Sequence, residues 1–350
     1  LAFAMLLDKD ITVPPSPELL GAFGVGILAK QKFKDNLLEK GSFDIEQLLK
    51  TEIINEKEFI CKACDNFCPI KVLNVNGHTY MFGGRCNKYA NSRKKKVIDE
   101  SSIFNYIDAR EQLMFGECSP DPSTLKKRKD YVVGIPKAFS VYTLWPFYSW
   151  FFHSLGIEVK LSEDILPEGV AKVESAYCFP AEIAHGAVQS ILDSDADFIF
   201  VPHFRDMPSY EDEVHANFCP ITQSLPYYIK KAFTEIDDRM MLAPIISFKY
   251  GIDKALECML ELAPQLDVSS GEIERAFKIA YSKQEDFFAR YKLLGIEAIE
   301  RARKSNHPVI AILGRPYNAF TKDANMGIPK KFTSRGYSVI PFDMLPFEET

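Results

Sequence analysis

Four of the eight cysteines lie between residues 61 and 86, as Cys61-x2-Cys64-x3-Cys68 followed by Cys86. No secretory signal is evident, so we expect a reducing cytoplasm, where clustered thiols bind metal or do redox chemistry rather than form disulfides. Four thiolates suit tetrahedral zinc or a [4Fe–4S] cluster. The spacing predicts a metal site held by these four cysteines and leaves the metal open.

The segment between Cys68 and Cys86 predicts a β-hairpin that brings these two cysteines together. Two apolar-rich runs, 70–75 and 79–82, flank Asn76-Gly77. Asn-Gly is the strongest short signal for a type I′ turn, because both central positions need positive φ. Such a turn folds the fourth cysteine back onto the first three. A hairpin that carries the last of four cysteine ligands is typical of a zinc ribbon. The Cys-x2-Cys-x3-Cys-Pro run, in contrast, is typical of the end of a bacterial ferredoxin motif.

Two further cysteines precede prolines that are placed where a helix begins, in Cys178-Phe-Pro180 and in Cys219-Pro220. Each cysteine is therefore predicted at or near an N-cap. The helix dipole and free N–H groups favour a thiolate there, and thiolates are what iron–sulfur clusters need. The alternative is two ordinary small residues in loops. Four polar residues lie nearby in sequence, each more often a satisfied polar group than a catalyst: Glu182, His185, His203 and His215.

The elements that must position these cysteines follow from an internal repeat. Segments 131–162 and 310–342 are similar after a shift of 180 residues, which aligns Gly134 with Gly314 and Val159 with Val339. Each has an apolar strand, a Gly-x-Pro loop, a helix-length stretch, a glycine and a second strand. This is the β-α-β pattern of a parallel sheet.

The first unit continues with a predicted helix over 180–192 and a strand over 197–201, and stretches 251–263 and 271–305 also predict helices. The expected fold class is α/β, with tandem Rossmann-like, doubly wound parallel sheets and a small cysteine-rich hairpin module. Ligands of such sheets bind beyond the carboxyl ends of the strands. Neither Gly-x-Pro loop has the Gly-x-Gly-x-x-Gly fingerprint, which disfavours a nicotinamide dehydrogenase.

Composition narrows the function classes. A chain of 350 residues predicts two or three domains. A net charge of -6 argues against nucleic-acid binding, and no apolar run is long enough for a membrane helix. The apolar stretch 1–7 lacks the basic start of a signal peptide and is interpreted as the end of a helix. The chain also stops just after a strand-like segment, so it is expected to be a fragment.

Three features together resemble the large activator-related proteins of the 2-hydroxyacyl-CoA dehydratase family. They are the four-cysteine hairpin, the run from Cys178 to Gly186 (CFPAEIAHG) and the run from Gly314 to Asn318 (GRPYN). In that family an ATPase activase of the sugar kinase/Hsp70 superfamily is fused to a region similar to the dehydratase subunits. Residues 14–24 look like the last stretch of the ATPase domain.

The resemblance implies an iron–sulfur redox component that passes low-potential electrons in anaerobic metabolism. It implies Cys178 and Cys219 as ligands of a [4Fe–4S] or related cluster, with a third ligand expected beyond Thr350. Two positions depart from the family pattern: Glu182 stands where a lysine is common, and Ala187 where a second histidine is usual. The implied partners are an activase ATPase domain, in the same chain or another, and an acyl-CoA dehydratase; a homodimer is compatible with the family. The phosphate-binding part of the ATPase fold is absent, so this chain is not expected to hydrolyse ATP.

The predicted organisation is a remnant of the ATPase domain with a linker, the cysteine-rich module with a linker, a first Rossmann-like domain, a helical connection, and the start of a second Rossmann-like domain. These cover residues 1–50, 51–128, 129–250, 251–306 and 307–350. The alternative function is a non-catalytic scaffold or docking module with structural zinc in the hairpin.

Overall fold

The computed structural model divides the chain into two compact units, one of residues 1–57 with 72–80 and one of residues 58–71 with 81–350. Among the described helices, none combines the length and the apolar character that a membrane crossing requires. The structure describes residues 2–37, 44, 46, 49–62, 66–85, 88 and 89, 103–174, 178–208, 216–304 and 308–345.

The first unit begins with helix α1 (Ala2–Leu7), where the sequence predicts the end of a helix, followed by η1 (Pro17–Leu19) and α2 (Leu20–Lys34). Apolar residues occur on all sides of α2, and none of its residues is buried in the described structure. Phe23, for example, is 67% exposed. Packing within the described chain therefore does not account for the apolar residues of α2.

The cysteine-rich segment forms a three-stranded sheet in the order β1-β2-β3. Its strands are β1 (Ile53–Ile60), β2 (Pro69–Val75) and β3 (His78–Gly83). The β2–β3 turn lies where the sequence predicts it, with φ of 50° at Asn76 and 83° at Gly77. Asn74 Oδ1 accepts the Gly77 N–H at 2.8 Å, which fixes the turn further. Strand β1 was not predicted and adds a third strand to the hairpin.

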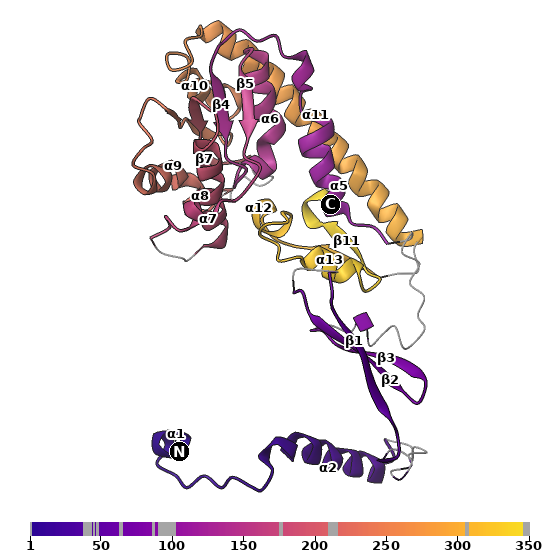
Figure 1. Ribbon diagram of the computed structural model, residues 1–350. Helices are drawn as coiled ribbons and strands as arrows, with labels where there is room; N and C mark the ends of the chain where they lie inside the picture. Colours follow the sequence, from indigo (N-terminus) through magenta and orange to yellow (C-terminus); the bar gives the residue numbers. More distant parts are fainter. Residues whose placement is uncertain are drawn as a thin grey trace. The chain divides into compact units, whose positions relative to one another are not determined.

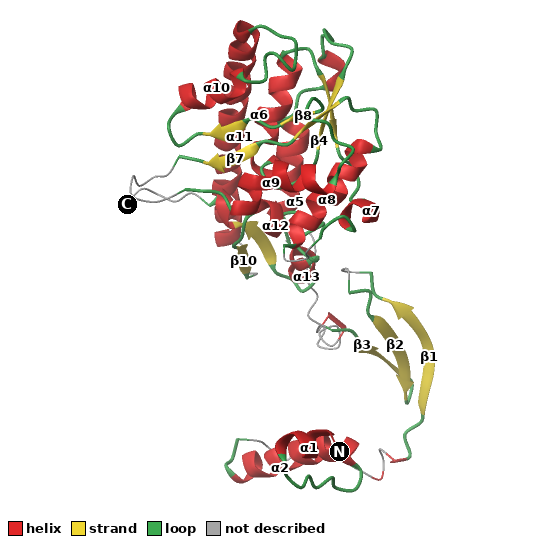
Figure 2. Cartoon of the chain, turned by 90° about the vertical axis from the view of Figure 1, so that its left-hand side faces the viewer, coloured by secondary structure: helices red, strands yellow, loops and turns green. Residues whose placement is uncertain are grey.

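The larger unit is built on a parallel four-stranded sheet in the order β5-β4-β6-β8 (Figure 2). The parallel sheet confirms the α/β class. Gly134 lies inside β4, where a Cβ atom would overlap Ile191 Cγ2 and lie 2.9 Å from Ala196 Cβ. The glycine thus lets α8 pack closely on the strand. The elements are β4 (Val132–Ile135), α6 (Val141–Ser154), β5 (Glu158–Leu161), α7 (Pro167–Val170), α8 (Phe179–Leu192), β6 (Phe198–Phe200), α9 (Pro220–Ala232) and β8 (Met241–Leu242).

A proline follows each of the neighbouring strands β6 and β8. After β6 the chain continues past Pro202 into β7 (His203–Asp206), and after β8 it passes Pro244 into β9 (Ile245–Ser247), which pairs parallel with β7. Proline has no N–H to donate to a neighbouring strand. The pairing of β6 with β8 therefore stops at Pro202 and Pro244, and the same two chain segments pair again as β7 and β9. The sequence predicts that the chain leaves the sheet after residue 201, whereas it forms a second short parallel pair.

A helical layer covers one face of the sheet, with the long helix α11 running alongside α6 (Figure 1). Its buried side chains and those of α6 form the main apolar core, in which Phe147, Phe151 and Phe277 are fully buried. The helices of this layer are α5 (Tyr106–Gln112), the π-helical turn η3 (Leu113–Glu117), the 3-10 turn η4 (Pro122–Thr124), α10 (Ile252–Leu260) and α11 (Ser270–Lys304).

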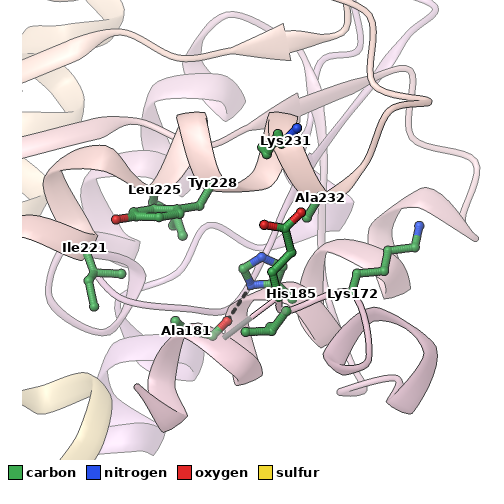
Figure 3. Close-up of a pocket in the computed structure, with 10 residues that line it drawn as sticks. Lys172, Ala181, His185, Ile221, Leu225, Tyr228, Lys231 and Ala232 are labelled. Carbon is green, nitrogen blue, oxygen red and sulfur yellow. Dashed lines mark hydrogen bonds between the residues drawn. The ribbon is translucent and has the colours of Figure 1, made fainter. Parts of the chain in front are cut away.

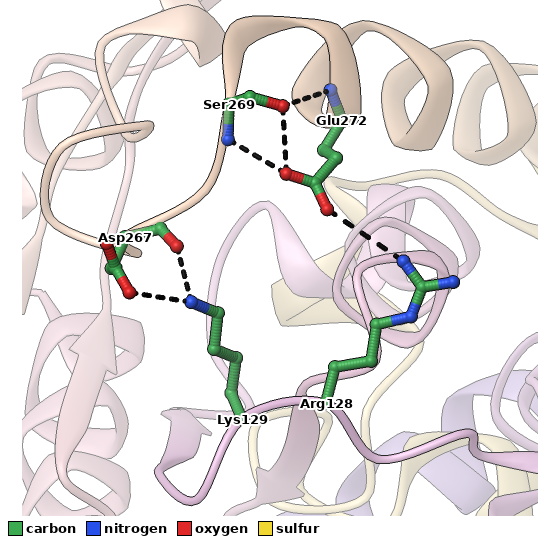
Figure 4. A network of polar contacts seen from close by, with 5 residues as sticks. All are labelled: Arg128, Lys129, Asp267, Ser269 and Glu272. Carbon is green, nitrogen blue, oxygen red and sulfur yellow. Dashed lines mark hydrogen bonds and ion pairs between the residues drawn. The ribbon is translucent and has the colours of Figure 1, made fainter.

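The start of α11 is fixed by a capping box (Figure 4). Ser269 Oγ accepts the N–H of Glu272 at 3.3 Å, and Glu272 Oε2 accepts the N–H of Ser269 at 2.9 Å. Arg128 lies 3.8 Å from Glu272, and Lys129 binds Asp267 just before the helix. These contacts join the start of α11 to the segment that leads into β4.

The second unit of the internal repeat is a parallel pair, β10 (Val309–Ile312) and β11 (Ser338–Pro341), with α12 (Pro316–Ala319) and α13 (Ile328–Thr333) between them. The single helix predicted here is thus two short helices. The repeat alignment is also shifted, because Val159 pairs with Val133 whereas Val339 pairs with Ile310. Gly314 consequently lies beyond its strand, and Gly134 lies within its own.

The second repeat unit, which contains β10 and β11, packs on α11 and α5. Gly295 of α11 contacts the backbone of Met344 in η5 (Phe342–Met344) so closely that a Cβ atom would overlap the Met344 carbonyl. The backbone N–H of Val339 donates to Phe104 O at 2.9 Å, which extends the β10–β11 pair by one bridge. These contacts hold β11 and the turn η5 that follows it.

Candidate functional site

Cys178 and Cys219 are the N-cap residues of α8 and α9, as the sequence predicts. Both have extended backbone, and a proline follows in the first turn of each helix. Because α8 leads into β6 and α9 into β8, both helices run against the parallel strands and begin at their carboxyl edge. His203, directly after β6, donates from Nδ1 to Gln223 O at 2.8 Å, which places the first turn of α9 at the end of that strand.

The sulfur of Cys219 is surrounded by hydrogen-bond donors. It accepts the backbone N–H of Thr222 at 3.4 Å and the hydroxyl of Tyr317 at 3.3 Å, and it lies 3.0 Å from Thr222 Oγ1. Burial by itself would raise the pKa of this thiol. The hydrogen bonds from Thr222 and Tyr317, with the Arg315 guanidinium nearby, outweigh burial and lower the pKa of Cys219 below its ordinary value. The surroundings favour a thiolate.

Tyr317 reaches Cys219 from the second repeat unit. Its hydroxyl accepts a hydrogen bond from Arg315 Nη1 at 3.0 Å and donates to Cys219, while its ring packs 4.9 Å from that of Phe139. Burial, and secondly the hydrogen bond to Cys219, raise the pKa of Tyr317 to about 12. The phenol therefore stays protonated and remains a donor at neutral pH. The loops after β4 and β10 meet at this contact.

Cys219, Arg315 and Tyr317 line one side of an open cavity of about 670 Å³, most of whose wall is aromatic or aliphatic. At another side lies Arg110, only 3% exposed, which donates from Nη2 to Tyr142 O at 2.8 Å and lies 3.4 Å from Asp343. Among the described residues, its Nε has no hydrogen-bond partner. The cavity thus combines a sulfur held by several donors with a buried guanidinium, within largely apolar walls.

Cys178 and Cys219 border the same apolar cluster, and their helices α8 and α9 pack against each other. The structure thus brings the beginnings of both helices to one edge of the sheet. Within the described ranges, no group of three or more His, Cys, Asp or Glu residues is arranged to hold a metal ion. A cluster shared by the two cysteines therefore stays a prediction.

At the hairpin the structure describes two of the four predicted ligands. Cys61 and Cys68 are both buried, and the Cys61 N–H donates to Cys68 O at 2.9 Å. The N–H of Arg85 points at Cys68 Sγ, 3.4 Å away, so the end of β3 returns to the third cysteine of the motif. Cys64 and Cys86 lie outside the described residues. The four-cysteine metal site remains a prediction.

The histidines near the cysteines have structural partners. His185, 5% exposed, donates from Nδ1 to Ala181 O at 2.7 Å in the first turns of α8 (Figure 3). Burial lowers the pKa of His185, so the ring is neutral at pH 7. It lines a cavity of about 150 Å³ between α8 and α9, together with Lys172 and Lys231. His203 bonds Gln223 as above, and His215 lies outside the described residues.

Sequence reasoning did not assign roles to Tyr317, Arg110 or Asp343. The Gly314–Asn318 run carries a family resemblance in the sequence, and in the structure it supplies the tyrosine that contacts Cys219. Arg110 and Asp343 are separated by 233 residues, and no local pattern marks either of them. Only the packing of the second unit on α5 and α11 brings them together.

A comparison with protein-family models identifies a related domain. The family model described as the CoA enzyme activase uncharacterised domain matches residues 132–345, from β4 to the residue after η5. No curated protein and no solved structure matches the chain. The matched range contains both Cys178 and Cys219 and excludes the hairpin.

Proposed function

The chain belongs to the family of the CoA enzyme activase uncharacterised domain, and from that premise we propose that it is an iron–sulfur redox component. It passes low-potential electrons within a system that activates an acyl-CoA dehydratase. Cys178 and Cys219 bind a [4Fe–4S] or related cluster at the carboxyl edge of the four-stranded sheet. The partners are an activase ATPase domain and the dehydratase, in the cytoplasm.

The surroundings of Cys219 are the observation that carries the proposal. A cysteine binds iron as the thiolate, and the three donor groups around this sulfur stabilise that form. Hydrogen bonds to a ligand sulfur also set the reduction potential of a cluster. When bound, a cluster supplies a one-electron redox centre. The chain's own residues supply the ligand, the donors and a cavity with largely apolar walls.

The donor set of the described residues fits two ligands at this edge, Cys178 and Cys219. The remaining ligand is proposed to come from outside the described residues. The pair β10–β11 is proposed to begin a second Rossmann-like domain, so that the cluster lies between the two repeat units. This arrangement is supported by the contact of Tyr317, from the second unit, with Cys219.

The hairpin is proposed as a separate, structural metal site with Cys61, Cys64, Cys68 and Cys86 as ligands, for zinc or a [4Fe–4S] cluster. Among the described residues, the apolar cluster around Cys61 and Cys68 has only Ile70 as a further buried member. So small a core needs a metal or an equivalent constraint to hold its strands together.

Iron, zinc and acid-labile sulfide contents of anaerobically purified protein test the proposal. We expect iron and sulfide in the wild type, and their loss in Cys178→Ser and in Cys219→Ser. Cys258→Ser is the matched control, because Cys258 is a partly buried thiol on α10, and it should keep the wild-type iron content.

Tyr317→Phe sharpens this test, because it removes the donor to Cys219 and keeps the ring that packs on Phe139. We expect iron to remain and the reduction potential to become more negative, since fewer hydrogen bonds then offset the negative charge of the reduced cluster. Zinc without iron in the wild type would contradict the redox proposal and favour the scaffold alternative.

A further inference from the structure

A second large cavity lies beside the edge strand β5, and neither Cys178 nor Cys219 is among the described residues that line it. Its volume is about 460 Å³, within the range of small-molecule sites. Its walls are one face of α6, the residues at the end of the π-helical turn η3, and the loop 119–125. It shares no lining residue with the cavity at Cys219. Whatever binds here is recognised by a different set of groups.

One face of α6 supplies the inner wall. Trp145, Ser149 and His153 lie four residues apart and therefore on one side of the helix. Trp145 and Phe115 have ring centroids 5.7 Å apart, so two aromatic side chains meet at this wall. His153 Nε2 lies 3.2 Å from Thr124 Oγ1, and burial is the main cause that lowers the pKa of His153. The imidazole adds no positive charge to the cavity at pH 7.

Hydrogen bonds from side chains of α6 and from Ser119, just after the turn, stabilise the π-helical turn η3. Ser119 Oγ lies 2.9 Å from Phe115 O, a carbonyl of the wide turn, and accepts the indole N–H of Trp145 at 2.6 Å. The indole N–H of Trp150 donates to Cys118 O at 2.9 Å. π-Helical turns are rare and occur frequently at functional sites. Here the turn places Phe115 and Gly116 in the cavity wall.

The charged groups of the cavity are all acidic. Asp121 and Glu158 line it, whereas no lysine or arginine is among the described residues of its wall. Hydrogen bonds from Ser123 keep the pKa of Asp121 below its ordinary value, so the carboxylate is ionised at neutral pH. Glu158 pairs with Lys127 at 2.9 Å, which partly offsets one of the two charges. A phosphate or carboxylate ligand would face these two carboxylates, and the nearby Lys127 ammonium is already paired with Glu158.

We propose that this cavity binds an organic cation, an amine with an aromatic or apolar body. The body packs on Phe115 and Trp145, and the ammonium group faces Asp121 and Glu158. Carboxylates attract the charge, and the face of an indole attracts a cation in addition. Binding here is independent of the proposed redox function, because the two cavities have separate walls.

Tryptophan fluorescence tests the proposal directly, because the chain has two tryptophans and Trp145 lines the cavity. Three probes of similar size differ in charge: 2-phenylethylamine, 2-phenylethanol and phenylacetate. We expect a saturable fluorescence change with the amine, binding at least about tenfold weaker with the alcohol, and none with the acid. Equal affinity for all three, or no saturable change with the amine, overturns the proposal.

Asp121→Asn is the decisive variant. Asparagine still caps η4, where Asp121 Oδ1 accepts the Ser123 N–H at 2.9 Å. We expect the affinity for 2-phenylethylamine to fall about two- to fivefold, as for an exposed ion pair, while that for 2-phenylethanol stays unchanged. Trp145→Phe, followed by calorimetry, should retain the preference for the amine but lose most of the fluorescence signal. An equal loss for amine and alcohol in Asp121→Asn would indicate a structural effect and contradict the charge argument.

Discussion

The two cysteine regions are assembled in opposite ways. In the hairpin, Cys61 and Cys68 are neighbours along the chain and meet through the ladder of a small sheet. At the sheet edge, Cys219 is contacted by Tyr317, 98 residues away in sequence, and the helix of Cys178 packs on the same apolar cluster. The hairpin depends on a turn and its own ligands. The edge region depends on the whole parallel sheet.

This difference implies that different substitutions should unfold the two regions. The apolar cluster of the hairpin has only three buried members among the described residues, so the hairpin should lose its structure with its metal. The edge region is supported by a large apolar core, so the positions of its cysteines should outlast loss of any cluster. Variants that separate the two responses test the comparison.

The largest effect is expected for Cys68→Ser. In a zinc-type site metal binding supplies on the order of 10 kcal/mol of local folding free energy, so the hairpin should unfold locally. Metal analysis should show loss of the hairpin metal, and limited proteolysis should cut within residues 53–85. The melting temperature of the domain built on the four-stranded sheet should stay near that of the wild type. An unchanged metal content together with unchanged protease resistance would show that Cys68 is not a ligand.

A smaller effect, in the opposite region, is expected for Gly134→Ala. The new Cβ atom overlaps Ile191 and approaches Ala196 to 2.9 Å, which should destabilise the body by about 1–3 kcal/mol. Thermal unfolding should shift down, while the hairpin keeps its metal and its protease resistance. Gly24→Ala is the control, because nothing lies within 4 Å of that position. Equal destabilisation of the hairpin would show that the two regions fold as one.

The smallest effect concerns pH. Burial lowers the pKa of both His185 and His153 from 6.5, so the unfolded chain binds more protons than the folded one below that pH. Stability should therefore fall as the pH is lowered through about 6.5. Melting temperatures at pH 7.5 and 5.5 measure the loss, and His185→Gln should reduce it. If the variant and the wild type lose the same amount, His185 does not contribute.

Several elements could be predicted because their signals are local. Asn76-Gly77 specifies its turn through two residues that tolerate positive φ. The prolines after Cys178 and Cys219 mark the first turns of α8 and α9, since proline suits that position alone in a helix. The alternation of apolar strands and helices indicated parallel pairing, and the sheet confirms it.

The second repeat unit shows where this reasoning stops. The shift of 180 residues predicted equivalent strands, yet β10 pairs in a different register and the expected helix is divided into α12 and α13. Register depends on how each strand fits its neighbours and the layer beneath it. The two similar sequences pack against different helices, the first against α8 at Gly134 and the second against α11 at η5. Their strands therefore pair in different registers.

The sequence by itself determined the α/β class, the hairpin turn and the N-cap positions of the two edge cysteines, because each follows from backbone preferences within a few residues. Only the tertiary structure decided that Tyr317 donates to Cys219, that Arg110 meets Asp343, and that Trp145 and Phe115 form a cavity wall with Asp121 and Glu158. These contacts join segments far apart in the chain. Their formation depends on the packing of whole layers, which no local pattern encodes.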